Sequence, residues 1–169
     1  MMELNIIPII PGKNDISHLT QIMMFKQIWL ISDKRSFLTG LHLRNFENTD
    51  LFLSCFAHVL PKGQNKFPYF KHYYRNVVLL TVGEHALYDQ GTEEARISYA
   101  LEVEQKSGGK STCDWAKLKA LEEELKKEYK KYFPTTRGLM IGIKYNLMEV
   151  GSIVGMLNER YMESLRRKP

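Results

Sequence analysis

The chain has 169 residues, 44% of them hydrophobic and 25% charged, with a formal net charge of +5. This length suits one domain with a sizeable core, and the composition excludes an intrinsically disordered chain. We therefore expect residues 1–169 to form a single domain. Net charge affects association rather than fold, and the positive net charge favours binding to an acidic partner.

Residues 1–106 are predicted to be rich in strands. Residues 2–10 look extended, and Asp15 can cap a short helix over residues 16–24. Four apolar runs then have the length and composition of strands, at residues 26–32, 36–44, 51–60 and 76–83. The first two are close enough to form a hairpin, whereas residues 61–75 make a longer connection.

The clearest strand pattern covers residues 96–104, where apolar and polar side chains alternate. One face of this strand would carry Ile97, Tyr99, Leu101 and Val103, and the other Ser98, Ala100, Glu102 and Glu104. Such alternation is typical of a strand with one buried and one solvated face, which antiparallel sheets allow.

The chain is predicted to become helical after residue 110. Apolar residues recur at spacings of three and four over residues 111–134, which predicts an amphipathic helix that Ser111 caps. Residues 138–146 read as a last strand and residues 147–165 as a second amphipathic helix, so residues 111–166 form a helix–strand–helix unit. The expected fold class is α+β, a mainly antiparallel sheet of about six or seven strands packed against two C-terminal amphipathic helices.

Charges along the chain change sign in blocks. Residues 51–83 hold four cations and no acid, residues 84–110 hold six acids against three cations, and residues 135–169 hold six cations against three acids. Two basic regions therefore flank an acidic centre. This polarity suits an electrostatically steered partner or head-to-tail self-association, so we expect a homo-oligomer.

The segment 62–75 gives the main functional prediction, because it carries four cations, five aromatic rings and no acid. Cations can neutralise phosphates, and rings can stack on unpaired bases. We therefore expect a non-catalytic module that binds nucleic acid, whether RNA or DNA. The residues expected to make this contact are Lys62, Lys66, Phe67, Tyr69, Phe70, Lys71, Tyr73, Tyr74 and Arg75. The competing interpretation is that the rings anchor a long loop to the core.

Two further functions fit parts of the sequence. The same rings and cations suit an anionic membrane surface or an acidic protein, as in a viral matrix-like structural protein that bridges membrane and nucleoprotein. Glu102, Glu104 and Lys106 on one strand face resemble the metal-binding end of a restriction-nuclease-type active site that uses Mg²⁺. The third carboxylate would have to come from Asp89, Glu93 or Glu94, and the short spacing from Asp89 to this strand argues against the nuclease.

No pattern indicates a cofactor or a metal ion. The five histidines are scattered, and phosphate-binding glycine loops and a nucleophile elbow are absent from the sequence. We therefore expect no cofactor and no catalytic residues.

The two cysteines, Cys55 and Cys113, are too few for a disulfide framework, and we expect inert thiols rather than a bridge. Glu3 and the lack of a cationic region near the N-terminus argue against a signal peptide. The longest uncharged apolar run, residues 51–61, is far shorter than the roughly 18–20 residues of a membrane span. The expected location is intracellular, in the cytoplasm or nucleus, or inside a virion if the protein is viral.

Overall fold

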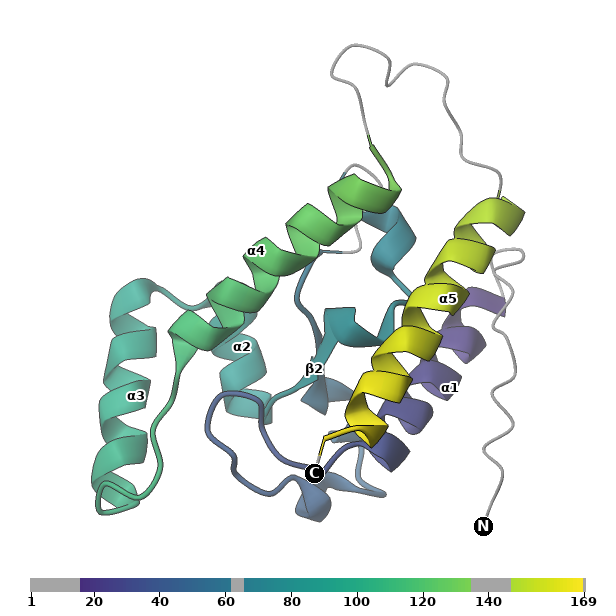
Figure 1. Ribbon diagram of the computed structural model, residues 1–169. Coiled ribbons are helices and arrows are strands. Elements are labelled where there is room, and N and C mark those ends of the chain that lie inside the picture. Colours follow the sequence, from purple (N-terminus) through teal and green to yellow (C-terminus); the bar gives the residue numbers. More distant parts are fainter. Residues whose placement is uncertain (1–15, 62–65, 135–146, 169) are drawn as a thin grey trace.

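A computed structural model describes residues 16–61, 66–134 and 147–168 (Figure 1). In these ranges the chain forms five α-helices, four short 3-10 helices and one two-stranded sheet. The predicted sheet of six or seven strands is therefore wrong, because helix dominates the structure. The strands expected at residues 2–10 and 138–146 lie outside the described residues.

The helices and strands follow one another in a simple order. The helices are α1 (Ile16–Ile31), α2 (Val82–Gln90), α3 (Glu93–Lys106), α4 (Trp115–Tyr132) and α5 (Leu147–Arg166). The strands are β1 (Phe56–His58) and β2 (Val77–Leu79), and the 3-10 helices cover Arg44–Phe46, Phe52–Cys55, Pro68–Phe70 and Tyr74–Asn76. The two strands are antiparallel, with Phe56 opposite Leu79 and His58 opposite Val77.

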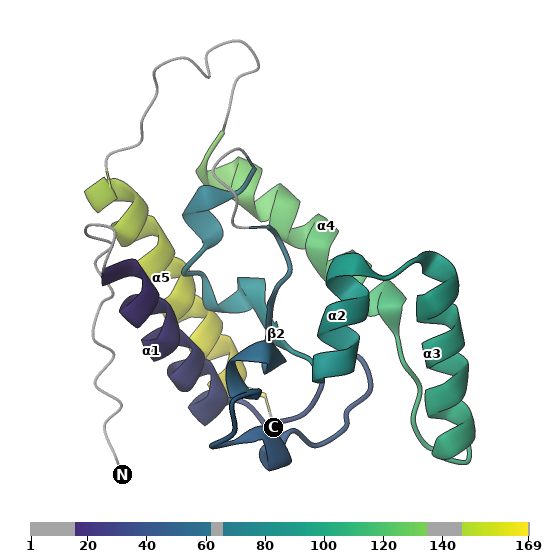
Figure 2. The ribbon, with the colours of Figure 1, turned by 180° about the vertical axis from the view of Figure 1, so that it is seen from behind.

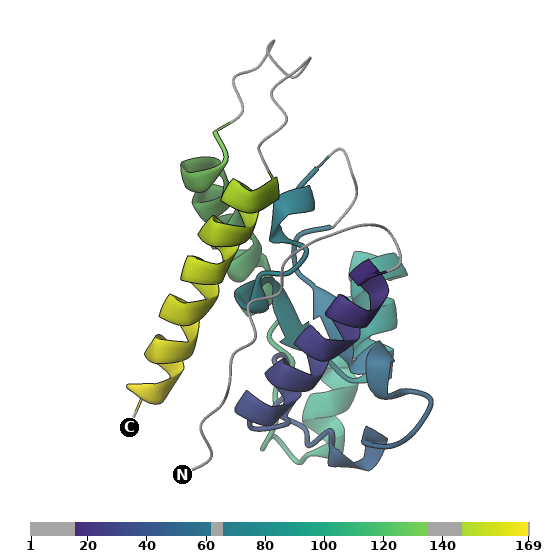
Figure 3. The same ribbon diagram turned by 90° about the vertical axis from the view of Figure 1, so that its right-hand side faces the viewer.

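The small sheet is the middle layer of three. Figure 3 shows α4 and α5 on one side of it and α1 on the other. The side chains of β2 alternate accordingly, because Val78 joins the apolar cluster of α4 and α5 while Val77 and Leu79 join the cluster around α1. Burial on both faces explains why β2 is apolar at every position.

Two expected strands are helical. Of residues 26–32, all but Ser32 lie in the second half of α1, a helix in which Phe25, Ile28 and Trp29 are buried. A short apolar run does not distinguish a buried strand from a buried helix. Residues 96–104 belong to α3, although their side chains alternate in polarity.

Residues at the N-terminus of α3 favour a helix over a strand. The Thr92 hydroxyl caps the helix by accepting a hydrogen bond from the Ala95 amide at 3.2 Å, and Glu93 and Glu94 occupy the first turn. Both features stabilise a helix N-terminus. Ile97 and Leu101, expected in the core, are each 55% exposed.

The remaining predicted strands are mostly irregular. Residues 36–44 fold back as a turn with an isolated bridge between Arg35 and His42. Residues 51–60 begin as a 3-10 helix and contain β1, and residues 76–83 contain β2 and then enter α2. The capping box of Thr81 and Glu84 starts α2 there and ends the extended run.

Both C-terminal helices are confirmed. The cap of α4 is Asp114 rather than Ser111, since the Asp114 carboxylate accepts a hydrogen bond from the Lys117 amide at 3.0 Å. The inner faces of α4 and α5 enclose the main core, in which these side chains are buried: Leu118, Leu125, Tyr129, Phe133, Val150, Val154 and Leu157.

Candidate functional site

The aromatic side chains of residues 66–75 belong largely to the core. Phe70, Tyr73 and Tyr74 are only 0%, 2% and 5% exposed, whereas Phe67 and Tyr69 are partly buried. Phe67, Tyr69 and Phe70 pack against α4 and the residue that follows it, whereas Tyr74 belongs to the cluster around α1. Their centroids lie 5.2 Å apart for Phe67 and Tyr129, 4.9 Å for Phe70 and Tyr129, and 4.8 Å for Tyr69 and Phe133. In this structure the three buried rings have no face on which a base can stack.

Arg75 is held by two carboxylates of α4. Its guanidinium pairs with Glu124 and, at 3.1 Å, with Glu128. The Tyr73 hydroxyl also donates to Glu128, at 3.2 Å, and burial followed by the Glu128 charge raises the pKa of Tyr73. Arg75 therefore fastens its segment to α4, and its charge is already balanced.

The lysines of the segment have different surroundings. Lys66 is exposed, and Lys71 is half-buried while its carbonyl accepts a hydrogen bond from His58 Nε2 at 3.1 Å. The predicted contact residue Lys62 lies outside the described residues. Lys66 directly precedes Phe67, so the packing of Phe67 on Tyr129 places Lys66 beside the C-terminal half of α4.

That half of α4 carries an exposed basic face. Lys127, Lys130 and Lys131 are all exposed and are separated by three and four positions, a spacing that puts side chains on one face of a helix. We call Lys66 and these three residues the lysine end. Among the described residues, no carboxylate forms an ion pair with any of the four. The acids nearest them in sequence pair with other cations, since Glu124 and Glu128 pair with Arg75 and Glu123 pairs with Lys126.

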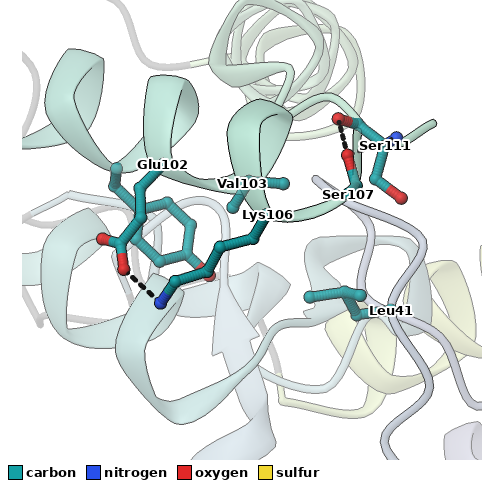
Figure 4. Close-up of a pocket in the computed structure, with 7 residues that line it drawn as sticks. Leu41, Glu102, Val103, Lys106, Ser107 and Ser111 are labelled. Carbon is teal, nitrogen blue, oxygen red and sulfur yellow. Dashed lines mark hydrogen bonds and ion pairs between the residues drawn. The ribbon is translucent and has the colours of Figure 1, made fainter. Parts of the chain in front are cut away.

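The nuclease-like residues do not share a face. Glu102 and Lys106 are four positions apart on α3 and form an ion pair, as Figure 4 shows. Glu104 is two positions from each, and residues two apart on a helix do not face each other. No group of three or more His, Cys, Asp or Glu side chains in the described part of the chain is arranged to hold a metal ion. The premise of a shared strand face is therefore wrong.

A small pocket lies between α3 and the turn at residues 36–44 (Figure 4). Its volume is about 370 Å³, and its lining includes Leu41, Tyr99 and Val103. The Ser107 hydroxyl at its edge donates to the Ser111 carbonyl at 3.1 Å. The pocket is thus mainly apolar, with the Glu102–Lys106 pair as its charged part.

A larger groove of about 980 Å³ runs over β1 between α1 and α2, the helices on either side of the sheet in Figure 2. His85 lines it and is fixed at both ring nitrogens, since Nδ1 lies 2.7 Å from the Ser54 carbonyl and Nε2 lies 3.3 Å from Asp89. His85 therefore connects α2 to the strand layer and presents no unoccupied ring nitrogen to the groove.

The two cysteines are free thiols, which confirms the expectation that they form no bridge. Burial, followed by the charge of Glu84, raises the pKa of Cys55 to about 11 and that of Cys113 to about 12, with Asp114 adding to the shift at Cys113. Thiolates are the nucleophilic form of cysteine, so neither thiol is activated for catalysis.

Comparison with protein-family models, curated proteins and solved structures finds no match for this chain. None of the described helices combines the length and the apolar character that a membrane span requires. A function is therefore inferred from the side chains, and the lysine end gathers four exposed cations that form no ion pair among the described residues.

Proposed function

We propose that the protein binds nucleic acid, without catalysis, through the lysine end. The observation that supports this proposal is a group of three exposed lysines on the C-terminal half of α4, with the exposed Lys66 in the segment that packs on this helix; none of the four forms an ion pair among the described residues. Each lysine that contacts a phosphate releases a bound counterion, which drives association without any need for sequence recognition. The partly buried rings of Phe67, which directly follows Lys66, and of Tyr132, which lies 5.4 Å from Lys131 Nζ, supply apolar contact for unpaired bases.

A purely structural role accounts for only part of this surface. Lys130 and Lys131 lie in the last turn of α4, where cations stabilise the negative end of the helix dipole. Lys127 is one turn earlier, and Lys66 belongs to a different segment. The helix dipole therefore explains Lys130 and Lys131 but not Lys66 and Lys127. Binding of a polyanion would explain all four lysines.

The test is oligonucleotide affinity as a function of salt concentration, for single and double strands. We expect log K to fall linearly with log salt, and the Lys66→Ala, Lys127→Ala, Lys130→Ala triple variant to reduce the slope by about 2 to 3. A matched control removes three exposed cations elsewhere, with Lys26→Ala, Arg44→Ala and Lys110→Ala.

The control decides whether location matters. Equal losses in the two variants would mean that net charge alone attracts the oligonucleotide, and the lysine end would be rejected. Absence of binding at low salt would reject the function. The membrane-bridging alternative is tested by measuring binding to anionic and neutral vesicles in parallel. It replaces the proposal if the protein binds no oligonucleotide and the triple variant loses binding to anionic vesicles.

A further inference from the structure

The outer face of α3 is an unpartnered surface of mixed character. Ile97 and Leu101 are four positions apart, so they are neighbours on the helix, and each is 55% exposed. The helical positions of Glu93, Glu94 and Glu104 place these exposed acids around the apolar pair. We call these five residues the α3 face.

The opposite face of α3 is bonded to α2 and to Trp115. Ile97 and Leu101 are therefore exposed while the rest of the helix is held in place. The Arg96 side chain donates to the Leu87 and Tyr88 carbonyls, both at 3.0 Å. The Trp115 indole donates to the Arg96 carbonyl at 3.2 Å, and Val103 is buried. These bonds hold α3 at the margin of the molecule, as Figure 1 shows.

The acids of the α3 face are not neutralised within the chain. No ion pair among the described residues involves Glu93, Glu94 or Glu104, whereas the neighbouring Glu102 pairs with Lys106. An apolar pair ringed by uncompensated carboxylates is complementary to an apolar surface ringed by cations. Such complementarity favours one docking orientation and suppresses others.

The lysine end has this complementary composition. Lys131 Nζ lies 5.4 Å from the centroid of the partly buried Tyr132 ring, and Lys66 directly precedes the partly buried Phe67. The lysine end and the α3 face lie near opposite ends of α4 (Figure 1), whose 18 residues span about 27 Å. One molecule therefore does not bring its own two surfaces together.

We propose that the α3 face binds the lysine end of a second copy of this chain, so that molecules associate head to tail. Two different surfaces meet in such a contact, so it builds a ring if the rotation closes and an open chain if it does not. The inference does not rest on nucleic-acid binding, although the two occupants compete for the same lysines.

The test is complementation, measured by sedimentation velocity over a range of protein concentrations at low salt and without nucleic acid. One variant carries Ile97→Ser and Leu101→Ser, and the other carries Lys127→Glu and Lys130→Glu. Each variant alone is expected to lose self-association by at least about tenfold in Kd. An equimolar mixture is expected to form a one-to-one dimer, because the first variant keeps its lysine end and the second keeps its α3 face.

Several results overturn the proposal. One is a monomer at all concentrations in the wild type. Another is a mixture of the two variants that stays monomeric while each is folded by circular dichroism. A control variant with Met23→Ser and Leu30→Ser changes the exposed apolar residues of α1, and it is expected to associate like the wild type. If this control is monomeric, the interface lies on α1. A Lys127→Gln, Lys130→Gln variant removes the charge with little strain on the helix, and it must also lose association.

Discussion

The Thr39 hydroxyl donates a hydrogen bond to Glu84 Oε1 at 2.7 Å, although Thr39 lies in the turn before β1 and Glu84 in α2. The other oxygen, Oε2, accepts from the Ser36 hydroxyl at 2.5 Å and from the Thr81 amide at 2.8 Å. Glu84 is completely buried. One carboxylate therefore fastens the turn at residues 36–39 to the start of α2.

We expect Glu84→Ala to be strongly destabilising, because it leaves the Ser36 and Thr39 hydroxyls buried without their acceptor. An unsatisfied buried donor costs about 1–3 kcal/mol, so the loss in the free energy of unfolding should exceed about 2 kcal/mol. Denaturant unfolding measures it. Glu104→Ala, at an exposed position of α3, is the control and should stay within about 0.5 kcal/mol. Equal effects would mean that the Glu84 bonds contribute nothing.

The thiols should resist alkylation in the folded protein. Burial and the Glu84 charge raise the pKa of Cys55 to about 11 and that of Cys113 to about 12, so the thiolate is scarce at pH 8. Mass spectrometry after iodoacetamide treatment should show alkylation at least about tenfold slower than in denaturant. Rates equal to those in denaturant would contradict the buried environment.

The same shifts fix the direction of a pH effect on stability. Folding favours the neutral thiols, so their contribution is complete below the ordinary pKa of 9.0 and is lost as the pH rises toward about 11 to 12. Unfolding midpoints should therefore fall above pH 9. Replacement of both cysteines by Ala should flatten this decline, and an unchanged decline would assign it to other groups.

Arg75→Ala should separate stability from binding. Because the pairs of Arg75 with Glu124 and Glu128 are partly solvated, their loss should cost about 1 kcal/mol or less of unfolding free energy. The salt slope of oligonucleotide binding should hardly change, in contrast to Lys66→Ala. A slope reduction equal to that of Lys66→Ala would show that Arg75 leaves its carboxylates to contact phosphate.

Phe70→Ala should be among the most damaging core changes. Phe70 is fully buried and packs edge-on against Tyr129 and Phe133, so the expected cost is about 3–5 kcal/mol. Chemical denaturation gives this value, and Leu51→Ala at an exposed site should change it by about 0.5 kcal/mol at most. A small effect for Phe70→Ala would mean that the segment is not anchored through its rings.

The sequence predicts an element correctly where its residue pattern is compatible with only one type of secondary structure. The long repeat of apolar residues at spacings of three and four indicates α4 and α5 correctly. In α3, alternating polarity suggests a strand, but the Thr92 cap and the acids after it favour a helix. The apolar run in α1 is compatible with either a buried strand or a buried helix, and only its packing against other segments decides for the helix. The predicted sheet was wrong because such ambiguous segments were assigned as strands.

The candidate site was only partly visible in the sequence. Composition draws attention to residues 62–75, but it does not show that Phe70 and Tyr73 point inward while Lys66 remains outside. Their orientation depends on α4, a contact distant in sequence. The spacing of Lys127, Lys130 and Lys131 was visible once α4 had been predicted, but their proximity to Lys66 required the packing of Phe67 on Tyr129.

The arrangement of charge along α4 also affects the orientation of the protein while it approaches a charged partner. The carboxylates of α3 lie near the start of α4 and the lysines near its end, about 27 Å away for 18 residues. This separation of opposite charges contributes to the electric dipole moment of the molecule. In the field of a polyanion the protein should rotate during its approach and arrive with the lysines leading. The protein would then be oriented before contact, and added salt would lower the association rate constant as well as the affinity.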